Sequence, residues 1–177
     1  MRIEGCDTAK RYSLSVRLPR VDGAGPVLLL SPLPLGFQRR LREHQVTPPT
    51  PPSRVARDPQ GRPLRQANGA AVLLSDEHDA DYLAERELYH QRVAVLSVVE
   101  SLRADPQVTF DTHSEDYPHD CRPYADRLYA ELEAAEWTAG DLVWLCAQVC
   151  PLSNLIDAHL AEAGADFFSA AATTGRS

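Results

Sequence analysis

The stretch "DADYLAERELYHQRVAVLSVVESLRADP", residues 79–106, decides the fold of this chain. Apolar side chains recur in it at the spacing of helix turns, which predicts a helix of about 20 residues or more with one buried face. Asp105 and Pro106 are expected to end this helix, because proline cannot continue it. The expected buried face consists of Tyr82, Tyr89, Val93, Leu96, Val99 and Leu102.

A second helix is expected to begin near Pro123, since proline fits the first turn of a helix. The four apolar residues of its stripe are Tyr124, Leu128, Leu132 and Ala135. We expect the helices to form the core of the protein, with Tyr89, Leu96, Leu128, Leu132, Leu145 and Leu160 buried.

Two more helices follow in the sequence. Thr138 and Asp141 have the spacing of a capping box, which predicts a helix over "DLVWLCAQVC" that ends at Pro151. Ser153 is expected to cap a last helix, "NLIDAHLAEA", with Gly164 as its stop.

The N-terminal part predicts a β-hairpin and a short helix. Tyr12, Leu14, Val16 and Leu18 alternate with polar residues, which is typical of a half-buried strand. "VDGAG" supplies a turn, and residues 26–33, "PVLLLSPL", are expected to return as the second strand. Residues 34–45 then place Phe37 and Leu41 four apart, the spacing of a short helix with arginines on its outer face.

Between these parts lies a proline- and arginine-rich arm, residues 46–78. The stretch "TPPTPPSRVARDPQGRP", residues 47–63, holds six of the 14 prolines and three arginines. Turn signals at residues 58–61 and 68–69, followed by "AAVLL" at 70–74, predict a small hairpin that projects outward. The sequence shows no internal repeat.

Two interpretations of this arm stay open. Extended proline-rich chain loses little entropy on docking, so the arm suits a segment that reaches a neighbouring chain. Alternatively it is a disordered insertion without a role, because surface loops tolerate added residues. Its composition buries little, and residues 46–76 are expected to be mobile in the isolated protein.

The fold class expected from these elements is α+β: an N-terminal β-hairpin and an extended arm on a mainly α-helical bundle. The expected divisions are residues 1–45 for the hairpin and short helix, 46–78 for the arm, 79–168 for the helical domain and 169–177 for a flexible tail. The 177 residues fit one domain with an appendage.

Charge is strongly divided along the chain. Residues 1–66 hold 12 Arg and Lys against five Asp and Glu, a net of +7, whereas residues 67–177 hold six against 20, a net of −14. This division favours contact between copies or with a charged partner, unless the basic part packs on the acidic helices of its own chain. An overall charge of −7 argues against nonspecific nucleic-acid binding.

Composition indicates a cytoplasmic protein with reduced thiols. Four cysteines in a chain of this length do not make a disulfide framework. No apolar run has the ~18 residues that a membrane span needs, and the first residues lack the apolar core of a secretory signal.

No catalytic motif for a hydrolase, an NTPase or a dinucleotide enzyme is present, so we expect a protein that is not an enzyme and has no cofactor. Glu131, Glu133 and Glu136 are interpreted as a solvated helix face rather than an acid/base set. The cluster "DEHDAD", residues 76–81, would suit a hard cation, but acidic residues at a helix start more often complement the helix dipole.

Four residues have the chemistry of a zinc site: His119, Cys121, Cys146 and Cys150. Cys146 and Cys150 are four apart and share a helix face, so their thiolates would point the same way. The same two cysteines also continue an apolar face, where free cysteine is a small buried hydrophobe. We therefore expect no metal, and whether the four residues meet in space is left open.

The order of these elements resembles the small tail assembly chaperones encoded between the tail-tube and tape-measure genes of long-tailed phages and prophages. The resemblance covers residues 11–45 and 80–165 and excludes the arm. It is carried by Leu33-Pro34-Leu35 after the strand pair, by the valines of a long helix (Val93, Val95, Val98, Val99), and by the step Leu152-Ser153-Asn154-Leu155.

The resemblance implies a non-enzymatic chaperone that binds the tape-measure protein, recruits tail-tube subunits and self-associates. The arginines expected to contact a partner are Arg39, Arg40, Arg54, Arg57, Arg62 and Arg65. Two alternatives remain: a structural tail component such as a completion or adaptor protein, and a zinc-stabilised regulatory or nucleic-acid-binding module.

Overall fold

The computed structural model describes residues 13–20 and 23–153. In order, the elements are β1 (Leu14–Arg17), β2 (Val27–Leu30), α1 (Phe37–Glu43), β3 (Ser53–Val55), β4 (Leu73–Ser75), α2 (Ala80–Leu102), the 3-10 turn η1 (Ser114–Asp116), α3 (Cys121–Ala134) and α4 (Ala139–Ser153). The α+β class expected from the sequence is confirmed. The expected last helix, the tail and Leu160 lie outside the described residues.

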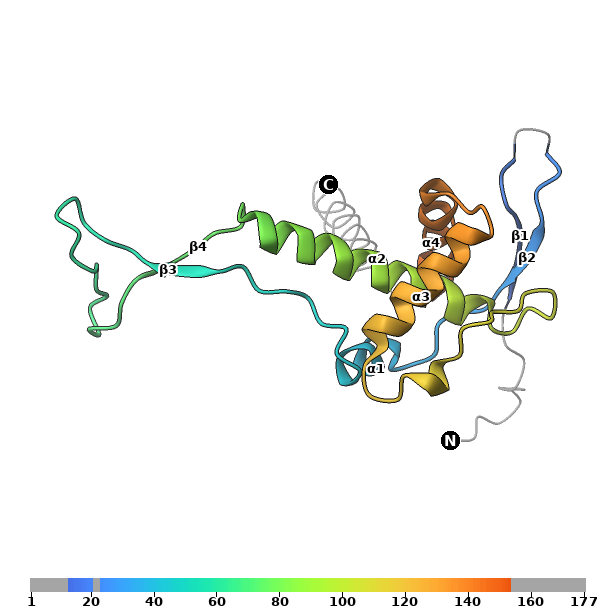
Figure 1. Cartoon of the computed structure of the whole chain (residues 1–177), viewed down its shortest axis with the longest axis horizontal. Coiled ribbons are helices and arrows are strands. Elements are labelled where there is room, and N and C mark those ends of the chain that lie inside the picture. Colours follow the sequence, from blue (N-terminus) through green and yellow to red (C-terminus); the bar gives the residue numbers. More distant parts are fainter. Residues whose placement is uncertain (1–12, 21–22, 154–177) are drawn as a thin grey trace, which may run out of the picture.

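Helix α2 runs through the centre of the molecule, and α1, α3, α4 and the hairpin of β1 and β2 gather around its C-terminal half (Figure 1). Helices α3 and α4 pack on α2, and strand β2 also touches it. The N-terminal half of α2 extends away from this body toward the arm. The long helix is thus both the centre of the core and a projecting rod.

The N-terminal hairpin is antiparallel, with Leu14 opposite Leu30 and Val16 opposite Leu28. Its apolar face consists of Val16, Leu18, Leu28 and Leu30. This face packs in one buried cluster with Val98 and Leu102 of α2 and with Leu145 and Val149 of α4. The hairpin therefore shares its core with the helical bundle.

A second cluster lies on the other side of α2. It joins Phe37, Leu41 and Val46, which come from α1 and the segment after it, to Val95, Leu96 and Val99 of α2 and to Tyr124, Ala125, Leu128 and Leu132 of α3. Because α2 is covered on two sides, Val95 and Val98 are buried as well as Leu96, Val99 and Leu102 of the stripe expected from the sequence. At the other end of that stripe, Tyr82, Tyr89 and Val93 are only half-buried, so the expectation that Tyr89 is a buried core residue is wrong.

The capping box of α4 is confirmed. Asp141 N–H donates to Thr138 Oγ1 at 3.1 Å, and Thr138 N–H donates to Asp141 Oδ2 at 2.9 Å. Asp141 is nearly inaccessible to solvent, and its Oδ1 accepts a 2.5 Å hydrogen bond from Arg20. This contact ties the turn after β1 to the start of α4.

Two local expectations are wrong. Helix α4 does not stop at Pro151 but continues through it to Ser153. The cap expected at Ser153 belongs to the last helix, which lies outside the described residues; the Ser153 Oγ accepts a hydrogen bond from Leu33 N–H at 2.9 Å. Ala135 is the exposed C-cap of α3 rather than part of its buried stripe.

Among the described residues no helix is both long and apolar enough to cross a membrane.

Candidate functional site

The arm leaves the body after the buried Val46 and returns at Asp79, the N-cap of α2. Its stem is an antiparallel pair of strands, with Arg54 opposite Leu74 and Val55 opposite Leu73. Asp76 N–H donates to Pro52 O at 2.8 Å and closes the base of the stem. The outward-projecting hairpin expected from the sequence is present, and it stands clear of the body beyond the end of α2 (Figure 1).

Three backbone segments meet at the end of this stem in a ring of hydrogen bonds. Ala56 N–H donates to Val72 O at 2.8 Å, Val72 N–H to Leu64 O at 2.9 Å, and Leu64 N–H to Ala56 O at 2.8 Å. Each of the three residues is therefore both donor and acceptor. Ala56 is buried by this junction although the arm has no core of its own. From here the chain makes two loops, residues 56–64 and 64–72, which we call the tip.

The two loops of the tip are built alike, eight residues apart. Gly61 N–H donates to Asp58 O, and Gly69 N–H to Gln66 O, each at 2.9 Å. In each loop an arginine closes the turn by donating to the glycine carbonyl: Arg57 to Gly61 at 2.8 Å, and Arg65 to Gly69 at 2.7 Å.

This eight-residue repeat lies in the hydrogen bonds and is not visible as a repeat in the sequence. The two copies, "ARDPQGRP" and "LRQANGAA", share only an arginine and a glycine at equal spacing. Two identities in eight residues do not stand out in a sequence, and the hydrogen bonds are what reveal the relationship. Each turn is further held by a side chain, since Asp58 Oδ1 accepts from Arg62 N–H and Asn68 Oδ1 from Ala70 N–H.

The six arginines expected at a partner surface fall into two groups. Arg39 and Arg40 belong to α1 and already form ion pairs, with Glu43 at 3.5 Å and Glu100 at 3.2 Å. The other four lie on the exposed arm, and no carboxylate of the described residues pairs with them: Arg54, Arg57, Arg62 and Arg65. The basic N-terminal part is therefore neutralised internally at Arg20 and Arg40, but not along the arm.

The arm and the projecting half of α2 also expose large apolar side chains. Leu73 and Leu74 of β4 are 61% and 48% accessible, values far from those of core residues. The other exposed members are Val55, Leu64, Leu83 and Leu88. Scattered surface leucines need no explanation, but these six share two neighbouring elements and no other part of the described chain covers them.

Acidic residues surround the start of α2. Asp79 Oδ1 accepts from Tyr82 N–H at 2.9 Å and caps the helix, and Asp76 Oδ1 accepts from His78 N–H at 3.2 Å. With Asp79 as N-cap and Asp81 in the first turn, the cluster lies where acidic residues complement the helix dipole. Further along, Asp81 and Glu85 are exposed and lie four residues apart, on one face of the helix.

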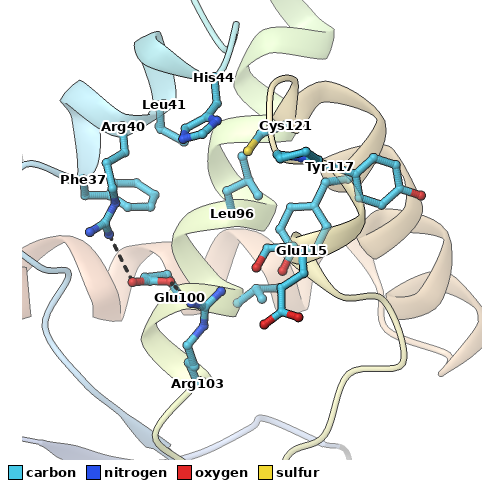
Figure 2. A pocket seen from close by; sticks show the side chains of 14 residues that line it. Phe37, Arg40, Leu41, His44, Leu96, Glu100, Arg103, Glu115, Tyr117 and Cys121 are labelled. Atoms are coloured by element: carbon cyan, nitrogen blue, oxygen red, sulfur yellow. Dashed lines mark hydrogen bonds and ion pairs between the residues drawn. The ribbon is translucent and has the colours of Figure 1, made fainter.

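A cavity of about 470 Å³ opens on the body between α1, α2, η1 and α3 (Figure 2). Its walls include Phe37, Leu41, Leu96 and Tyr117, and its charged edge is the chain of ion pairs from Arg40 through Glu100 to Arg103. This volume and lining suit an apolar group rather than a charged one.

The thiol and the imidazole that line this cavity do not form an activated pair. Burial, with a smaller effect from Asp120, raises the pKa of the Cys121 thiol, so the reactive thiolate is disfavoured. His44 Nδ1 is buried without a hydrogen-bond partner among the described residues. A base without an orienting partner beside a protonated thiol lacks the geometry of an activated nucleophile.

The structure does not bring together the four candidate zinc ligands, His119, Cys121, Cys146 and Cys150. Cys121 packs with the cluster of α1 and α3, whereas Cys146 packs with that of the hairpin and α4, and its Sγ lies 3.8 Å from Ala94 O. In the described ranges no three His, Cys, Asp or Glu side chains are grouped so that they would hold a metal ion.

The three glutamates of α3 and its end also have separate surroundings. Glu131 accepts hydrogen bonds from Asp111 N–H at 2.7 Å and Thr112 N–H at 3.1 Å, and so fixes the loop before η1. Glu133 and Glu136 are exposed. A structural role for Glu131 was not foreseen, since no local pattern relates it to a loop 20 residues earlier.

No protein-family model, no curated protein and no solved structure matches this chain. Its function therefore has to be inferred from the residues and contacts described above.

Proposed function

We propose that this chain is a non-enzymatic assembly protein of the tail assembly chaperone kind, which binds its partners through the arm. The tape-measure and tail-tube proteins are the partners that the sequence resemblance implies, and the host cytoplasm is the compartment. One observation carries the proposal: a preformed arm that projects from the body with unpaired arginines and exposed leucines.

The contacts of the arm support a binding role over that of an unstructured insertion. An insertion without a role has no need of a closed hydrogen-bond ring at Ala56, Leu64 and Val72, or of two arginine-held turns. A preformed element loses less conformational entropy when it binds than a disordered one does. Its unpaired arginines and exposed apolar side chains are the residue types on which protein interfaces depend.

The geometry of the stem allows a clean test. Because Asp76 N–H contacts Pro52 O at 2.8 Å, residues 53–75 can be replaced by a short Gly-Ser linker without moving the ends. We expect this variant to keep the unfolding midpoint of the native body. It should lose binding to the tape-measure and tail-tube proteins that the resemblance implies, measured by calorimetry or pull-down of purified components.

A second variant tests whether a change of exposed arginines outside the arm also abolishes binding. Exchanging Arg42 and Arg127, which are exposed and lie outside the arm, for glutamate should leave binding intact. If the arm-less protein folds and binds both partners as the native chain does, the chaperone proposal loses its structural support. Retention of the protein in purified tail particles would instead favour the structural-component alternative.

A further inference from the structure

We infer that the arm has a specific receptor, the exposed N-terminal half of α2 in a second copy of this chain, so that two chains exchange arms. The inference rests on the proposed role of the arm as a binding element. The resemblance implies self-association but does not say which residues of the two copies meet. Three observations carry it: charge, apolar surface and the placement of both elements within one chain.

Charge is complementary between the two elements. Residues 53–73 of the arm hold four arginines and one aspartate. The start of α2 presents the opposite sign, with Asp81 and Glu85 exposed on one face. Neither set is neutralised by the described residues of its own chain. Opposed patches of this kind steer association and fix its register.

Apolar side chains accompany the charges on both elements. On the helix, Leu88 lies seven residues after Asp81 and so continues the face of Asp81 and Glu85. It also borders a groove of about 310 Å³ that runs between α2 and the base of the arm, near Pro49. On the arm, Leu73 and Leu74 are exposed on the two faces of β4. A hydrophobic centre with a charged margin is the usual composition of a specific interface.

The placement of the two elements permits a closed dimer. The arm leads directly into α2, so both complementary surfaces occur in each copy beside one another (Figure 1). When the arm of one copy lies on α2 of the other, a twofold axis places the second arm on the first helix in the same way. Such isologous contacts use each surface once and end at two chains.

The same charges disfavour nucleic acid as the occupant. A phosphate backbone that followed the arm would pass Asp76, Glu77 and Asp79 at its base. Like charges at that position repel it. The arginines therefore fit the carboxylates of a protein better than a polyanion, and a second copy supplies those carboxylates.

Charge exchange tests the arrangement with two variants. The first, Arg54→Glu with Arg62→Glu, reverses exposed arm residues that hold neither turn through their side chains. The second, Asp81→Lys with Glu85→Lys, reverses the helix face. We expect the native chain to have twice the mass of one copy by light scattering and each variant alone to be a monomer. An equimolar mixture of the two variants should recover the dimer, because every arm then meets a helix of opposite charge.

Two controls accompany the mixture. The pair Arg42→Glu and Arg127→Glu, and the pair Glu133→Lys and Glu136→Lys, make the same changes in charge at exposed sites elsewhere and should remain dimeric. Recovery in the mixture should weaken as salt is added, since exposed charges are screened. Circular dichroism of each variant establishes that it is folded.

The inference is overturned if the native chain is a monomer, if either variant alone is dimeric, or if the folded variants do not associate when mixed. It is also overturned if the native chain binds a DNA duplex or heparin with the salt dependence of phosphate contacts, and if the variant Asp81→Lys with Glu85→Lys binds that polyanion as well. A native chain that is a monomer but still binds the tape-measure and tail-tube proteins would contradict this inference alone and leave the proposed function standing.

Discussion

Ser101 and Ser31 exchange two hydrogen bonds across 70 residues of chain. Ser101 Oγ donates to Ser31 O at 2.6 Å, and Ser31 N–H donates to Ser101 O at 2.9 Å. Both residues are buried, so neither bond has water as a substitute. The pair joins the end of strand β2 to the last turn of α2, where the helix would otherwise leave a carbonyl unpaired.

Replacing Ser101 by alanine is expected to lower the free energy of unfolding by about 1–3 kcal/mol, because a buried acceptor loses its donor. Urea denaturation measures the change. Ser97→Ala is the matched control: the Ser97 hydroxyl donates at 2.7 Å to Val93 O within its own helix, a bond that adds little to helix stability. Equal losses in the two variants would contradict the role given to Ser101.

Leu132 should be a core residue, since only 7% of its surface is accessible. Leu132→Ala is expected to cost about 2–5 kcal/mol of stability, the range for truncating a buried leucine. Leu35 is fully exposed, and Leu35→Ala should change the stability by less than ~0.5 kcal/mol. A loss below this value at Leu132 would mean that the packing face of α3 is misplaced.

The Arg20–Asp141 pair should make stability depend on pH in the acid range. The hydrogen bond from Arg20, together with those from Thr138, lowers the pKa of the Asp141 carboxyl below its ordinary value. The stabilisation is therefore complete above the unfolded pKa of about 3.9 and is lost as the pH falls through the folded pKa. Asp141→Asn should be less stable than the native chain at neutral pH, and the difference should shrink as acid protonates the native carboxyl.

Urea unfolding of both proteins across this pH range measures the effect. Asp126→Asn is a suitable comparison, because the Asp126 side chain is 46% accessible in its pair with Arg92 and exposed pairs contribute only about 0–1 kcal/mol. A stability difference at Asp141 that does not vary with pH would show that Arg20 does not act on the charged form.

Cys146 should be the slowest to react of the three described cysteines. Burial, with a smaller effect from Cys150, raises its pKa to about 11. Two pKa units above the ordinary value reduce the reactive thiolate at neutral pH on the order of a hundredfold. Alkylation followed by mass spectrometry should label Cys121 and Cys150 first, and the rate at Cys146 should rise with pH. In urea the three should react alike; early labelling of Cys146 in the native protein would contradict its packing against α2.

The glycines at the two turns of the tip should stabilise the arm but not affect the stability of the body. Gly61 and Gly69 have φ angles of 78° and 84°, and nothing lies near the position of an added Cβ. Gly61→Ala and Gly69→Ala therefore strain the turns by roughly 1–2 kcal/mol each through conformation alone. Hydrogen exchange should speed up at Leu64 and Val72 while the unfolding midpoint of the body is unchanged.

Gly140→Ala is the control for these glycines, because Gly140 lies in the first turn of α4 with ordinary contact distances and alanine favours a helix there. It should raise the stability of the body and leave exchange in the arm as it was. If the tip variants instead lowered the midpoint of the body, the arm would not be an independent element.

Local patterns in the sequence determined the elements of this protein. The period of residues 79–106 predicted α2, and Thr138 with Asp141 predicted the cap of α4. Alternation predicted β1, and the turn after it predicted β2 as the returning strand. The turn signals after Asp58 and at Asn68-Gly69 predicted the hairpin of the arm. Each depends on residues within a few positions of one another, where spacing alone fixes which groups share a face or a turn.

Tertiary structure decided which of these elements share surroundings. Asp141 meets Arg20 across 121 residues, and the buried Asp105 accepts from Leu29 N–H across 76, relations that no local spacing encodes. Packing also carried α4 through Pro151, although proline lacks the N–H of a helical residue. Tertiary structure also decided that the arginines of the arm have no carboxylate partner among the described residues. Whether a charge has a partner depends on the approach of distant segments, and here those segments reach Arg20 and Arg40 but not the arm.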